Sequence, residues 1–273
     1  MSSVSVIVPT WNRADMIKKA VQSAINQTYP PLEILVCDDG SIDNTEKIIN
    51  SLNDPRVIWV KGSHSGSPAI TRNRGILKCK GEWIAFLDSD DEWLPKKLQK
   101  QIELAYKLGC KAICSNAYRL LPERGIVGTL LTWNKEIIML DDLLNCNQVI
   151  CSSVMIHRSL FEKTNGFPED TKVIEDYALW LRIAIMSDFA FVNEPLVIYR
   201  DDAVNSIRSK VISDELLQRK YIFNDFLNWA KNYRSINKSY HHFIQKVRRE
   251  YWKTIFNLWI RKIRNFLSMN INN

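Results

Sequence analysis

Short apolar runs alternate with amphipathic stretches along the first 110 residues of the chain. Runs rich in β-branched residues predict strands, and apolar residues at three- and four-residue steps between them predict helices. The predicted strands cover residues 3–10, 32–39, 56–62 and 82–88, and the predicted helices cover residues 12–27, 43–53, 67–80 and 92–108. This order predicts an α/β fold with a mostly parallel sheet and helices on both faces. Ligands of such sheets gather at the carboxyl ends of the strands.

The alternation loosens beyond residue 110. Strands are predicted at 112–121, 152–157 and 189–200, a helix is predicted at 173–186, and helical spacing returns from residue 213 onward. No internal repeat is visible. The pattern therefore predicts one α/β domain over residues 1–207, followed by a helical tail over residues 208–273.

Acidic residues crowd the ends of two predicted strands. Asp38 and Asp39 end the second strand, and the run FLDSDDEW places four acidic groups within five positions after the fourth strand. Crowded carboxylates repel one another unless a partner offsets their charge, and a hard divalent cation does so. A helix N-cap also uses an acidic side chain, but one is enough. Both clusters are expected at the same rim of the sheet, as a cation or nucleotide site.

Composition narrows the class of protein. The chain has 273 residues, of which 46% are hydrophobic, and this is ample for a core. Its apolar runs are far shorter than the roughly 20 residues that span a bilayer, and its N-terminus lacks a signal-peptide pattern. Six scattered cysteines without a C-x-x-C pair favour reduced thiols over a zinc site. These features predict a cytoplasmic globular protein.

Two polar stretches are ambiguous when they are taken alone. DDGSIDNT fits an ordinary turn, in which Asp43 or Asn44 caps the next helix, as well as a binding loop. RNRG at residues 72–75 offers two arginines, which suit phosphate oxygens, although a solvated helix face also explains them. The four histidines share no spacing, so they predict no common site.

Taken together, these stretches resemble glycosyltransferase family 2, the inverting transferases of GT-A fold. The resemblance is carried, in the family's order, by SVIVPTWNR, NQTYPPLEILVCDDGSIDNT, SPAITRNRGI, GEWIAFLDSDDEWLP, SSVMIHRSLFEKTNGFPED and EDYALWLRIA. It implies a GT-A, Rossmann-like fold with a C-terminal helical extension. Residues 1–110 are then the nucleotide-binding half of a catalytic domain, and residues 111–207 are its acceptor half.

The resemblance also implies roles for single residues on the donor side. The D-x-D motif falls on Asp88 and Asp90, which are expected to hold Mn²⁺ or Mg²⁺ on the diphosphate, and Asp39 is expected to hydrogen-bond a uracil ring. Asp91 is then either a side chain that supports the metal-binding aspartates or the cap of the next helix. The full set expected to bind the nucleotide is Pro9, Thr10, Asn12, Asp39, Arg72, Asn73, Asp88 and Ser89.

The family's E-D pair falls on Glu175 and Asp176, and Asp176 matches the catalytic base. An inverting transfer needs one base to take a proton from the attacking hydroxyl group, while positive groups offset the charge of the leaving diphosphate. Acidic residues in a first helical turn are also favourable without any catalysis. Many relatives carry a further acid two residues after the pair, where this chain has Ala178. The candidates for the positive groups are Arg72, Arg74, Arg200 and Arg208.

The implied activity is a metal-dependent inverting sugar transfer. The expected donor is a nucleotide sugar, UDP-linked, and the expected acceptor is a hydroxyl group of a glycan or of a lipid-linked acceptor. The expected context is lipopolysaccharide, capsule or other surface polysaccharide synthesis. Two other classes share parts of the pattern. A phospho-receiver domain has a similar acidic pocket but opens with its Asp pair and needs a Lys-Pro dipeptide, and a sugar nucleotidyltransferase needs a glycine-rich loop where VPTWNRADMI has no glycine.

The tail carries most of the positive charge. Residues 208–273 hold 14 Lys and Arg against 4 Asp and Glu, which leaves 23 against 26 in residues 1–207, and the net charge is +7. Residues 241–267 combine apolar residues at helical steps with basic ones, which fits a helix on an anionic membrane surface. A helix docked on the domain with a solvated basic face fits equally well, and nucleic-acid binding is disfavoured because no recognition module is present. The residues expected to touch a membrane are Arg248, Arg249, Trp252 and Trp259.

Overall fold

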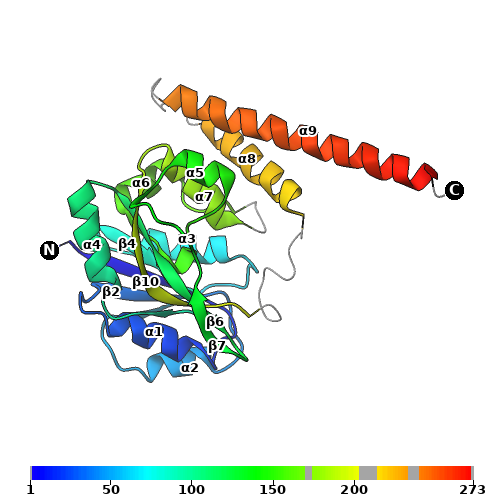
Figure 1. The fold of residues 1–273 in the computed structure, drawn as a ribbon. Helices are drawn as coiled ribbons and strands as arrows, with labels where there is room; N and C mark the ends of the chain where they lie inside the picture. Colours follow the sequence, from blue (N-terminus) through cyan, green and yellow to red (C-terminus); the bar gives the residue numbers. More distant parts are fainter. Residues whose placement is uncertain (1, 170–173, 203–213, 233–239, 272–273) are drawn as a thin grey trace.

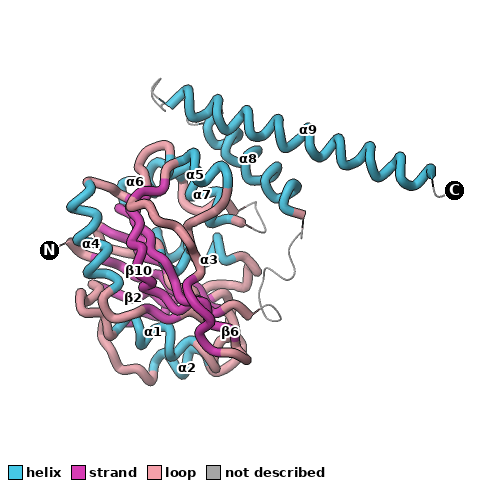
Figure 2. The backbone as a smooth tube through the Cα atoms, viewed as in Figure 1, coloured by secondary structure: helices cyan, strands magenta, loops and turns pink. Residues whose placement is uncertain are grey.

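The computed structural model describes residues 2–169, 174–202, 214–232 and 240–271. A ten-stranded sheet runs through the molecule in the order β3-β2-β1-β4-β9-β6-β10-β5, with β7 beside β6 and β8 beside β10 (Figure 1). Helices lie on both faces of this sheet (Figure 2). The strands are β1 (Val4–Thr10), β2 (Glu33–Asp38), β3 (Val57–Val60), β4 (Trp83–Phe86), β5 (Glu92–Trp93), β6 (Ala112–Leu121), β7 (Gly125–Thr129), β8 (Ile137–Ile138), β9 (Met155–His157) and β10 (Phe189–Arg200).

The first four strands are parallel, as the alternation predicts. β1 pairs with β2 on one side and with β4 on the other, and β2 also pairs with β3. Thr10 lies opposite Asp38 and Ile7 lies opposite Phe86, so the central strands bring their carboxyl ends to the same rim. Every residue of β2 is buried, which explains its continuous apolar run.

The second half of the sheet is mixed. β9 enters between β4 and β6 and is antiparallel to both, whereas β6 and β10 are parallel to each other. The short strands β5 and β8 pair antiparallel with β10, and β7 pairs antiparallel with β6. The predicted α/β fold with a large sheet between helices is confirmed, and its parallel pairs are confined to β1–β4 and to β6 with β10.

Side chains that alternate along β1 divide the core into two layers. Val6 and Val8 belong to the layer under α1 (Ile17–Ile25), α2 (Thr45–Asn50) and α4 (Lys97–Leu108). Ile7 points to the opposite face and belongs to the layer under the other helices. These are α3 (Pro68–Lys78), α5 (Leu140–Asn145), α6 (Arg158–Thr164) and α7 (Glu175–Ala184), together with the C-terminal helices.

The helix predicted from residue 92 begins later than expected. Glu92 and Trp93 form β5 and pair with Ile198 and Val197 of β10, and α4 begins only at Lys97. Pro95 supplies the reason, because the residue before a proline is biased toward extended backbone. The predicted helix at 12–27 is also shorter in the structure. The predicted strand at 152–157 is shortened to β9, because its first residues belong to a single 3₁₀ turn, η1 (Cys151–Ser153).

The C-terminal helices are joined to the body. α8 (Glu215–Asn232) packs on α7, and α9 (His241–Ile271) packs on α8 and extends beyond the rest of the molecule (Figure 1). Phe223, Phe226 and Val247 are fully buried and belong to the same core layer as α7. None of the helices in the described ranges combines the length and apolarity that a bilayer crossing requires. A domain boundary at residue 207 stays a prediction.

Candidate active site

The predicted site residues gather where β1, β2 and β4 end. Thr10 is the last residue of β1, Asp38 is the last residue of β2, and Asp88 follows the end of β4 by two positions. Pro9 and Thr10 are placed by the β1 register beside Cys37 and Asp38. This is the rim at which parallel sheets bind ligands.

The turn after β1 is fixed to the turn after β2. Asn12 has a φ of 51°, a conformation that asparagine tolerates better than most residues. Its backbone N–H donates to Ser41 Oγ (2.8 Å), and its Oδ1 accepts the N–H of Ile42 (2.9 Å). The N–H of Arg13 donates to Thr45 Oγ1 (3.0 Å). Asn12 therefore shapes the rim by holding the two turns together.

Asp39 holds a third loop at the rim. Its carboxylate accepts the backbone N–H of Ser65 (3.0 Å), the Ser65 hydroxyl (2.6 Å) and the N–H of Gly66 (2.8 Å). Burial works against the charge of this carboxylate, but the hydrogen bonds outweigh burial and lower the pKa of Asp39. Asp39 is therefore an anion that anchors the loop carrying His64, Ser65 and Gly66.

An aromatic pair joins this loop to the turn after β1. The ring of His64 stacks on Trp11, with ring centres 4.6 Å apart and planes inclined by 22°, and its Nδ1 lies 3.0 Å from Asp39 Oδ2. The Trp11 side chain is 49% exposed, although large aromatic residues are usually well buried. The set of residues predicted to bind the nucleotide includes neither of them. An aromatic residue directly after a strand end was the available signal for Trp11, because such a ring can stack on a ligand at the rim.

Three aspartates follow β4 within four positions. Asp88 and Asp90 are partly exposed, and Asp91 is buried. Burial raises the pKa of Asp90, and the negative charge of Asp88 raises it further. Arg13 Nη2 approaches Asp90 Oδ2 only to 3.8 Å. The crowding that FLDSDDEW predicts is therefore present, and nearby cations offset only part of it.

Asp91 does not cap the next helix, which corrects one of the two predicted roles. Its Oδ1 accepts the backbone N–H of Arg200 at the end of β10 (2.9 Å), whereas α4 begins only at Lys97. Burial raises the pKa of Asp91 well above its usual range, and the charges of Asp90 and Asp88 add to this effect. Asp91 thus connects the acidic turn to β10 from below the surface.

The acidic turn rests on η1. Ser152 Oγ accepts the backbone N–H of Asp88 (3.0 Å), and the Ser152 carbonyl accepts the indole N–H of Trp93 (2.7 Å). Gln101 Nε2 donates to the carbonyl of Ser153 (2.6 Å), so α4 also fixes this turn. The sequence pattern predicts a strand for these residues and gives no sign of this supporting role.

Arg72 joins the two ends of the site. Its Nη2 donates to Asp88 Oδ1 (2.6 Å), and its Nη1 donates to Glu175 Oε1 (2.6 Å). The guanidinium is buried and lies 5.3 Å from the centre of the Phe167 ring. Asn73, predicted to bind the nucleotide, instead exchanges hydrogen bonds with the backbone N–H and carbonyl of Phe167 (2.8 and 2.9 Å).

Glu175 and Asp176 form the first turn of α7 and are partly buried. The thiol of Cys151, in η1, is buried. Burial raises the pKa of Cys151 well above its usual range, the Arg72 guanidinium opposes this shift, and the charges of Asp88 and Asp176 add to it. The charges at both ends of the site therefore act on this one buried thiol.

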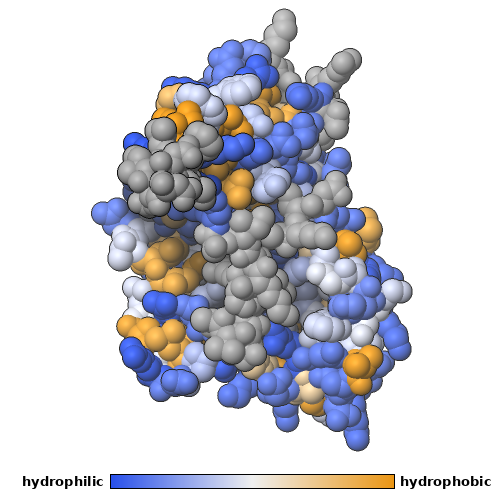
Figure 3. All heavy atoms as spheres, turned by 90° about the vertical axis from the view of Figure 1, so that its right-hand side faces the viewer, coloured by the Kyte–Doolittle hydropathy of each residue, from blue (hydrophilic) through white to orange (hydrophobic). Residues whose placement is uncertain are grey.

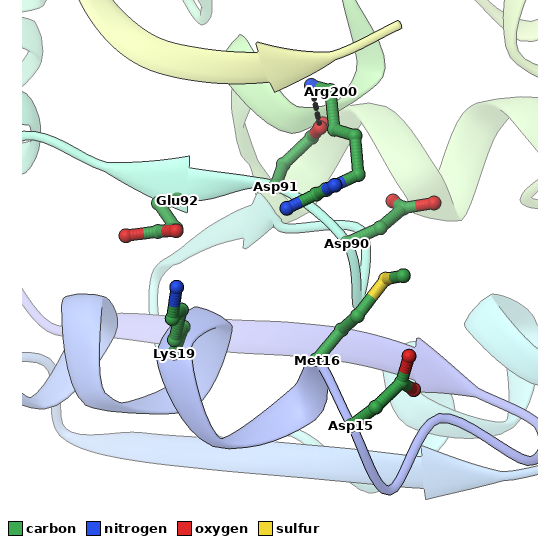
Figure 4. A pocket seen from close by; sticks show the side chains of 7 residues that line it. All are labelled: Asp15, Met16, Lys19, Asp90, Asp91, Glu92 and Arg200. Carbon is green, nitrogen blue, oxygen red and sulfur yellow. Dashed lines mark hydrogen bonds between the residues drawn. The ribbon is translucent and has the colours of Figure 1, made fainter. Parts of the chain in front are cut away.

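A small pocket lies beside the acidic turn (Figure 4). It is lined by Asp15, Met16, Lys19, Asp90, Asp91, Glu92 and Arg200. The Arg200 side chain reaches between Asp90 and Glu92 in Figure 4, so this predicted cation lies next to the acidic turn. Arg74 donates instead to the backbone carbonyl of Asp38 (2.7 Å), and Arg208 lies outside the described residues.

A family model described as "Glycosyl transferase family 2" matches residues 5–164, which is more than half of the chain. The chain belongs to glycosyl transferase family 2. It is 38% identical over 183 residues to an Escherichia coli protein named UDP-Glc:alpha-D-GlcNAc-diphosphoundecaprenol beta-1,3-glucosyltransferase WfaP, covering 67% of this chain and 70% of that one. It is also 32% identical over 201 residues to a Bacillus subtilis protein named putative teichuronic acid biosynthesis glycosyltransferase TuaG, covering 72% and 78%.

Solved structures share the fold of this family 2 transferase. The S. aureus TarS 1-349 structure in complex with UDP-GlcNAc aligns with a TM-score of 0.73 at 19% identity, covering 93% of this chain and 73% of that one. A mannosyltransferase from Pyrobaculum calidifontis in complex with GDP-Man and Mn2+ aligns with a TM-score of 0.59 at 17% identity, covering 92% and 69%. The predicted GT-A fold is thereby confirmed.

The carboxylates of this transferase suit a divalent cation that arrives with a diphosphate. The described residues contain no group of three or more His, Cys, Asp or Glu side chains that could hold a metal ion. Mg²⁺ is usually bound by one or two carboxylates while substrate phosphates complete its shell, so two carboxylates suffice. Asp88 and Asp90 stand at the rim with part of their charge not offset, which fits this requirement.

The structure brings most of the predicted residues to one place. Asp39, Asp88, Ser89, Asp90, Glu175 and Asp176 lie at or next to the rim together with Pro9, Thr10, Asn12 and Arg72. Asn73 faces the Phe167 backbone. Arg248, Arg249, Trp252 and Trp259 lie on α9, away from the rim. The roles assigned to all of these residues stay predictions.

Proposed function

We propose that this family 2 transferase is metal-dependent and inverting, and that it moves a sugar from a UDP-linked donor to a hydroxyl group of a glycan acceptor in surface polysaccharide synthesis. One arrangement carries the proposal. Asp88 of the acidic turn and Glu175 of α7, which directly precedes Asp176, meet at a single buried guanidinium, that of Arg72. A donor clamp and a general base are thus neighbours, as a one-step transfer requires.

On the donor side, Asp88 and Asp90 would hold Mn²⁺ or Mg²⁺. The bound ion would neutralise charge that develops on the leaving diphosphate. Trp11 offers a ring face for the base, and Asp39 fixes the adjoining loop. Arg13 and Arg200 lie beside the acidic turn and suit phosphate oxygens. The two E. coli relatives whose names specify UDP-Glc, at 38% and 34% identity, support a UDP-linked donor and make UDP-glucose the first sugar to try.

On the acceptor side, Asp176 would take the proton from the attacking hydroxyl group. A carboxylate at the first turn of a helix stays charged readily, because the helix N-terminus favours negative charge. Attack on the anomeric carbon from the side opposite the diphosphate gives a β-linkage from an α-linked donor. The names of two relatives specify a diphosphoundecaprenol-linked acceptor, and this supports a lipid-linked acceptor here.

A lipid-linked acceptor would be met at a membrane, and α9 suits that contact. Its apolar residues are divided between two faces. Val247 and Tyr251 pack on the body, whereas Trp252, Phe256 and Trp259 are more than half exposed. Around α8 and α9, at the top of Figure 3, hydrophobic and hydrophilic residues lie side by side. We propose that this exposed face rests on the cytoplasmic surface of the membrane.

One face of α9 thus packs on the body and another is exposed. A docked helix and a membrane-binding helix, the two alternatives that the sequence leaves open, are therefore compatible. The described part of the chain contains six free cysteines and no disulfide, which supports a reducing compartment. Family membership gives no support to a phospho-receiver or a sugar nucleotidyltransferase. No nucleic-acid partner is proposed.

Calorimetric titration of UDP, with and without Mn²⁺, tests the donor clamp. The wild type is expected to bind UDP tightly only with the metal, and Asp90→Asn is expected to remove that dependence. Inverting transfer from UDP-glucose to a lipid-diphosphate-linked sugar is then assayed. If UDP does not bind under any condition while another nucleoside diphosphate does, the donor carries that other nucleobase in place of uracil. Binding of no nucleoside diphosphate at all would refute the clamp.

A further inference from the structure

Arg72 is held by carboxylates from both halves of the site. Asp88 comes from the turn after β4, and Glu175 comes from α7, 103 positions away from Arg72 along the chain. Each N–O distance is 2.6 Å, and the Arg72 side chain is only 6% exposed. Charge-assisted hydrogen bonds of this length are among the stronger ones in proteins. One guanidinium therefore fixes the orientation of two acidic groups at once.

The surroundings lock this guanidinium in place. Phe167 covers it at 5.3 Å, and the backbone of Phe167 is held by the Asn73 side chain from the same helix as Arg72. Gly166 completes the arrangement, because a Cβ atom there would lie 2.5 Å from Asn73 Oδ1. A ligand could displace Arg72 only by opening this set of contacts. Direct binding of phosphate by Arg72 is therefore disfavoured.

We propose that Glu175 and Arg72 are positioning residues that couple the acceptor half of the site to the donor half. Glu175 holds Arg72, and Arg72 in turn holds the Asp88 carboxylate in the orientation that nucleotide binding needs. Asp176 alone acts on the acceptor hydroxyl group. This inference rests on the proposed function and assigns different roles to the two residues of the E-D pair, positioning to Glu175 and proton transfer to Asp176.

Substitutions of Glu175 and Asp176 are therefore expected to change different quantities, UDP affinity for Glu175 and kcat for Asp176. Glu175→Gln removes the negative charge that faces Arg72 and is expected to weaken UDP binding in the presence of Mn²⁺ by about tenfold or more, because a neutral amide oxygen holds a guanidinium more weakly than a carboxylate does. Asp176→Asn is expected to leave UDP affinity unchanged and to lower kcat by about 10²-fold or more. Arg72→Lys, which cannot span both carboxylates in the same way, is expected to weaken UDP binding as Glu175→Gln does.

A second buried arginine supplies the matched control. Arg182 of α7 is also buried, donates to Asp225 of α8 (2.6 Å) and lies 5.6 Å from the centre of the Trp229 ring. It links these two helices and, unlike Arg72, contacts neither Asp88 nor Glu175. Asp225→Asn breaks that pair, and it is expected to lower stability without changing UDP affinity. A loss of UDP affinity in Asp225→Asn equal to that in Glu175→Gln would show only general destabilisation and would overturn the proposal.

A double-mutant cycle tests whether Glu175 acts through Arg72. The pair Arg72→Gln and Glu175→Gln is expected to lose no more UDP affinity than Arg72→Gln alone, because residues in one network are not additive. Additive losses would overturn the coupling. If Glu175→Gln keeps normal UDP affinity and loses kcat as Asp176→Asn does, Glu175 is the catalytic base and the proposal is wrong. If Glu175→Gln does not fold, Arg72→Lys with Glu175→Asp takes its place in the cycle. Failure of the wild type to bind UDP with Mn²⁺ would refute the proposed function instead.

Discussion

At the scale of single residues, the exposed ring of Trp11 supports the proposed nucleotide site at the rim. It directly follows β1 at the rim, and its only stacking partner among the described residues is His64. An exposed tryptophan is unfavourable unless it meets a ligand or partner, because its large apolar surface faces water.

Trp11→Ala is therefore expected to weaken UDP binding by about five- to 150-fold, since stacking of a base on an aromatic side chain contributes about 1–3 kcal/mol. Trp11→Phe, which keeps a ring, should retain most of the affinity. Calorimetric titration of UDP with Mn²⁺ measures both. Unchanged affinity in Trp11→Ala would mean that the base binds elsewhere on the rim.

The sequence predicts the acidic residues of the rim well, for a physical reason. Asp38, Asp39 and Asp88 end parallel strands, and strand order alone brings such ends together. The contacts of Ser152 and His64 are different, because they join segments far apart in the chain through loops whose paths no periodicity records. RNRG marks Arg72 as a candidate, but nothing in the sequence indicates its two partners, Asp88 and Glu175.

At the scale of elements, the start of α4 shows how local signals compete. Acidic residues and helical spacing predict a helix from residue 92, but pairing with β10 and the restriction imposed by Pro95 win, and Glu92 and Trp93 extend the sheet. Trp93 is thereby aimed at the Ser152 carbonyl. The short strand thus supports the acidic turn, which a helix at these residues would not do.

α4 also buries a lysine without an acidic partner among the described residues. Lys97 Nζ donates to Gln101 Oε1 (2.8 Å) and lies 4.0 Å from the centre of the Trp93 ring. Burial lowers the pKa of Lys97 well below its usual range, and only the thiol of Cys114 opposes the shift. Between that lowered pKa and the ordinary value of about 10.4, the unfolded chain binds more protons, so the free energy of unfolding rises with pH.

Lys97→Met is expected to flatten this rise and to stabilise the fold near neutral pH by on the order of 1 kcal/mol, because it no longer buries an ionisable group. Urea unfolding at pH 7 and pH 9 measures both effects. Lys107→Met, at an exposed position of the same helix, is the control and should change neither. A pH slope in Lys97→Met equal to that of the wild type would show that Lys97 does not control it.

At the scale of the whole molecule, the alternating pattern predicts the α/β class but not the complete sheet. The parallel half follows from strand–helix alternation, whereas β9 is inserted between β4 and β6 by a connection that carries no such pattern. α8 is likewise more deeply joined to the body than a separate tail would be, since Phe223 and Phe226 are fully buried. Helical spacing predicts a helix but not which partner covers it.

The exposed face of α9 lies at one end of this molecule, formed by Trp252, Phe256, Trp259 and Ile263. Their spacing of four, three and four positions places them on one side of the helix. Between residues 248 and 264 the chain has six basic residues and one acidic one. A second copy of this face would meet the same charge, whereas an anionic lipid surface would attract it.

The double variant Trp252→Ser and Trp259→Ser is therefore expected to lose most of its co-sedimentation with vesicles that contain anionic lipid. Wild-type binding should also fall with added salt, because screening weakens attraction to the lipid charge. UDP affinity should stay unchanged, since α9 lies away from the rim. Point variants are preferred to deletion of α9, because Val247 and Thr254 are buried against the body and deletion would uncover the core.

Leu77→Ser supplies the control for general hydrophobicity. Leu77 is 87% exposed on α3, so its replacement removes apolar surface outside α9 and is expected to leave vesicle binding unchanged. Equal vesicle binding by the wild type and the double tryptophan variant would exclude α9 as the contact. If the wild type instead self-associates in solution and the double variant does not, the face binds a second copy of the chain. Retained vesicle binding at high salt would assign the contact to apolar insertion alone, because the attraction between α9 and anionic lipid depends on unscreened charge.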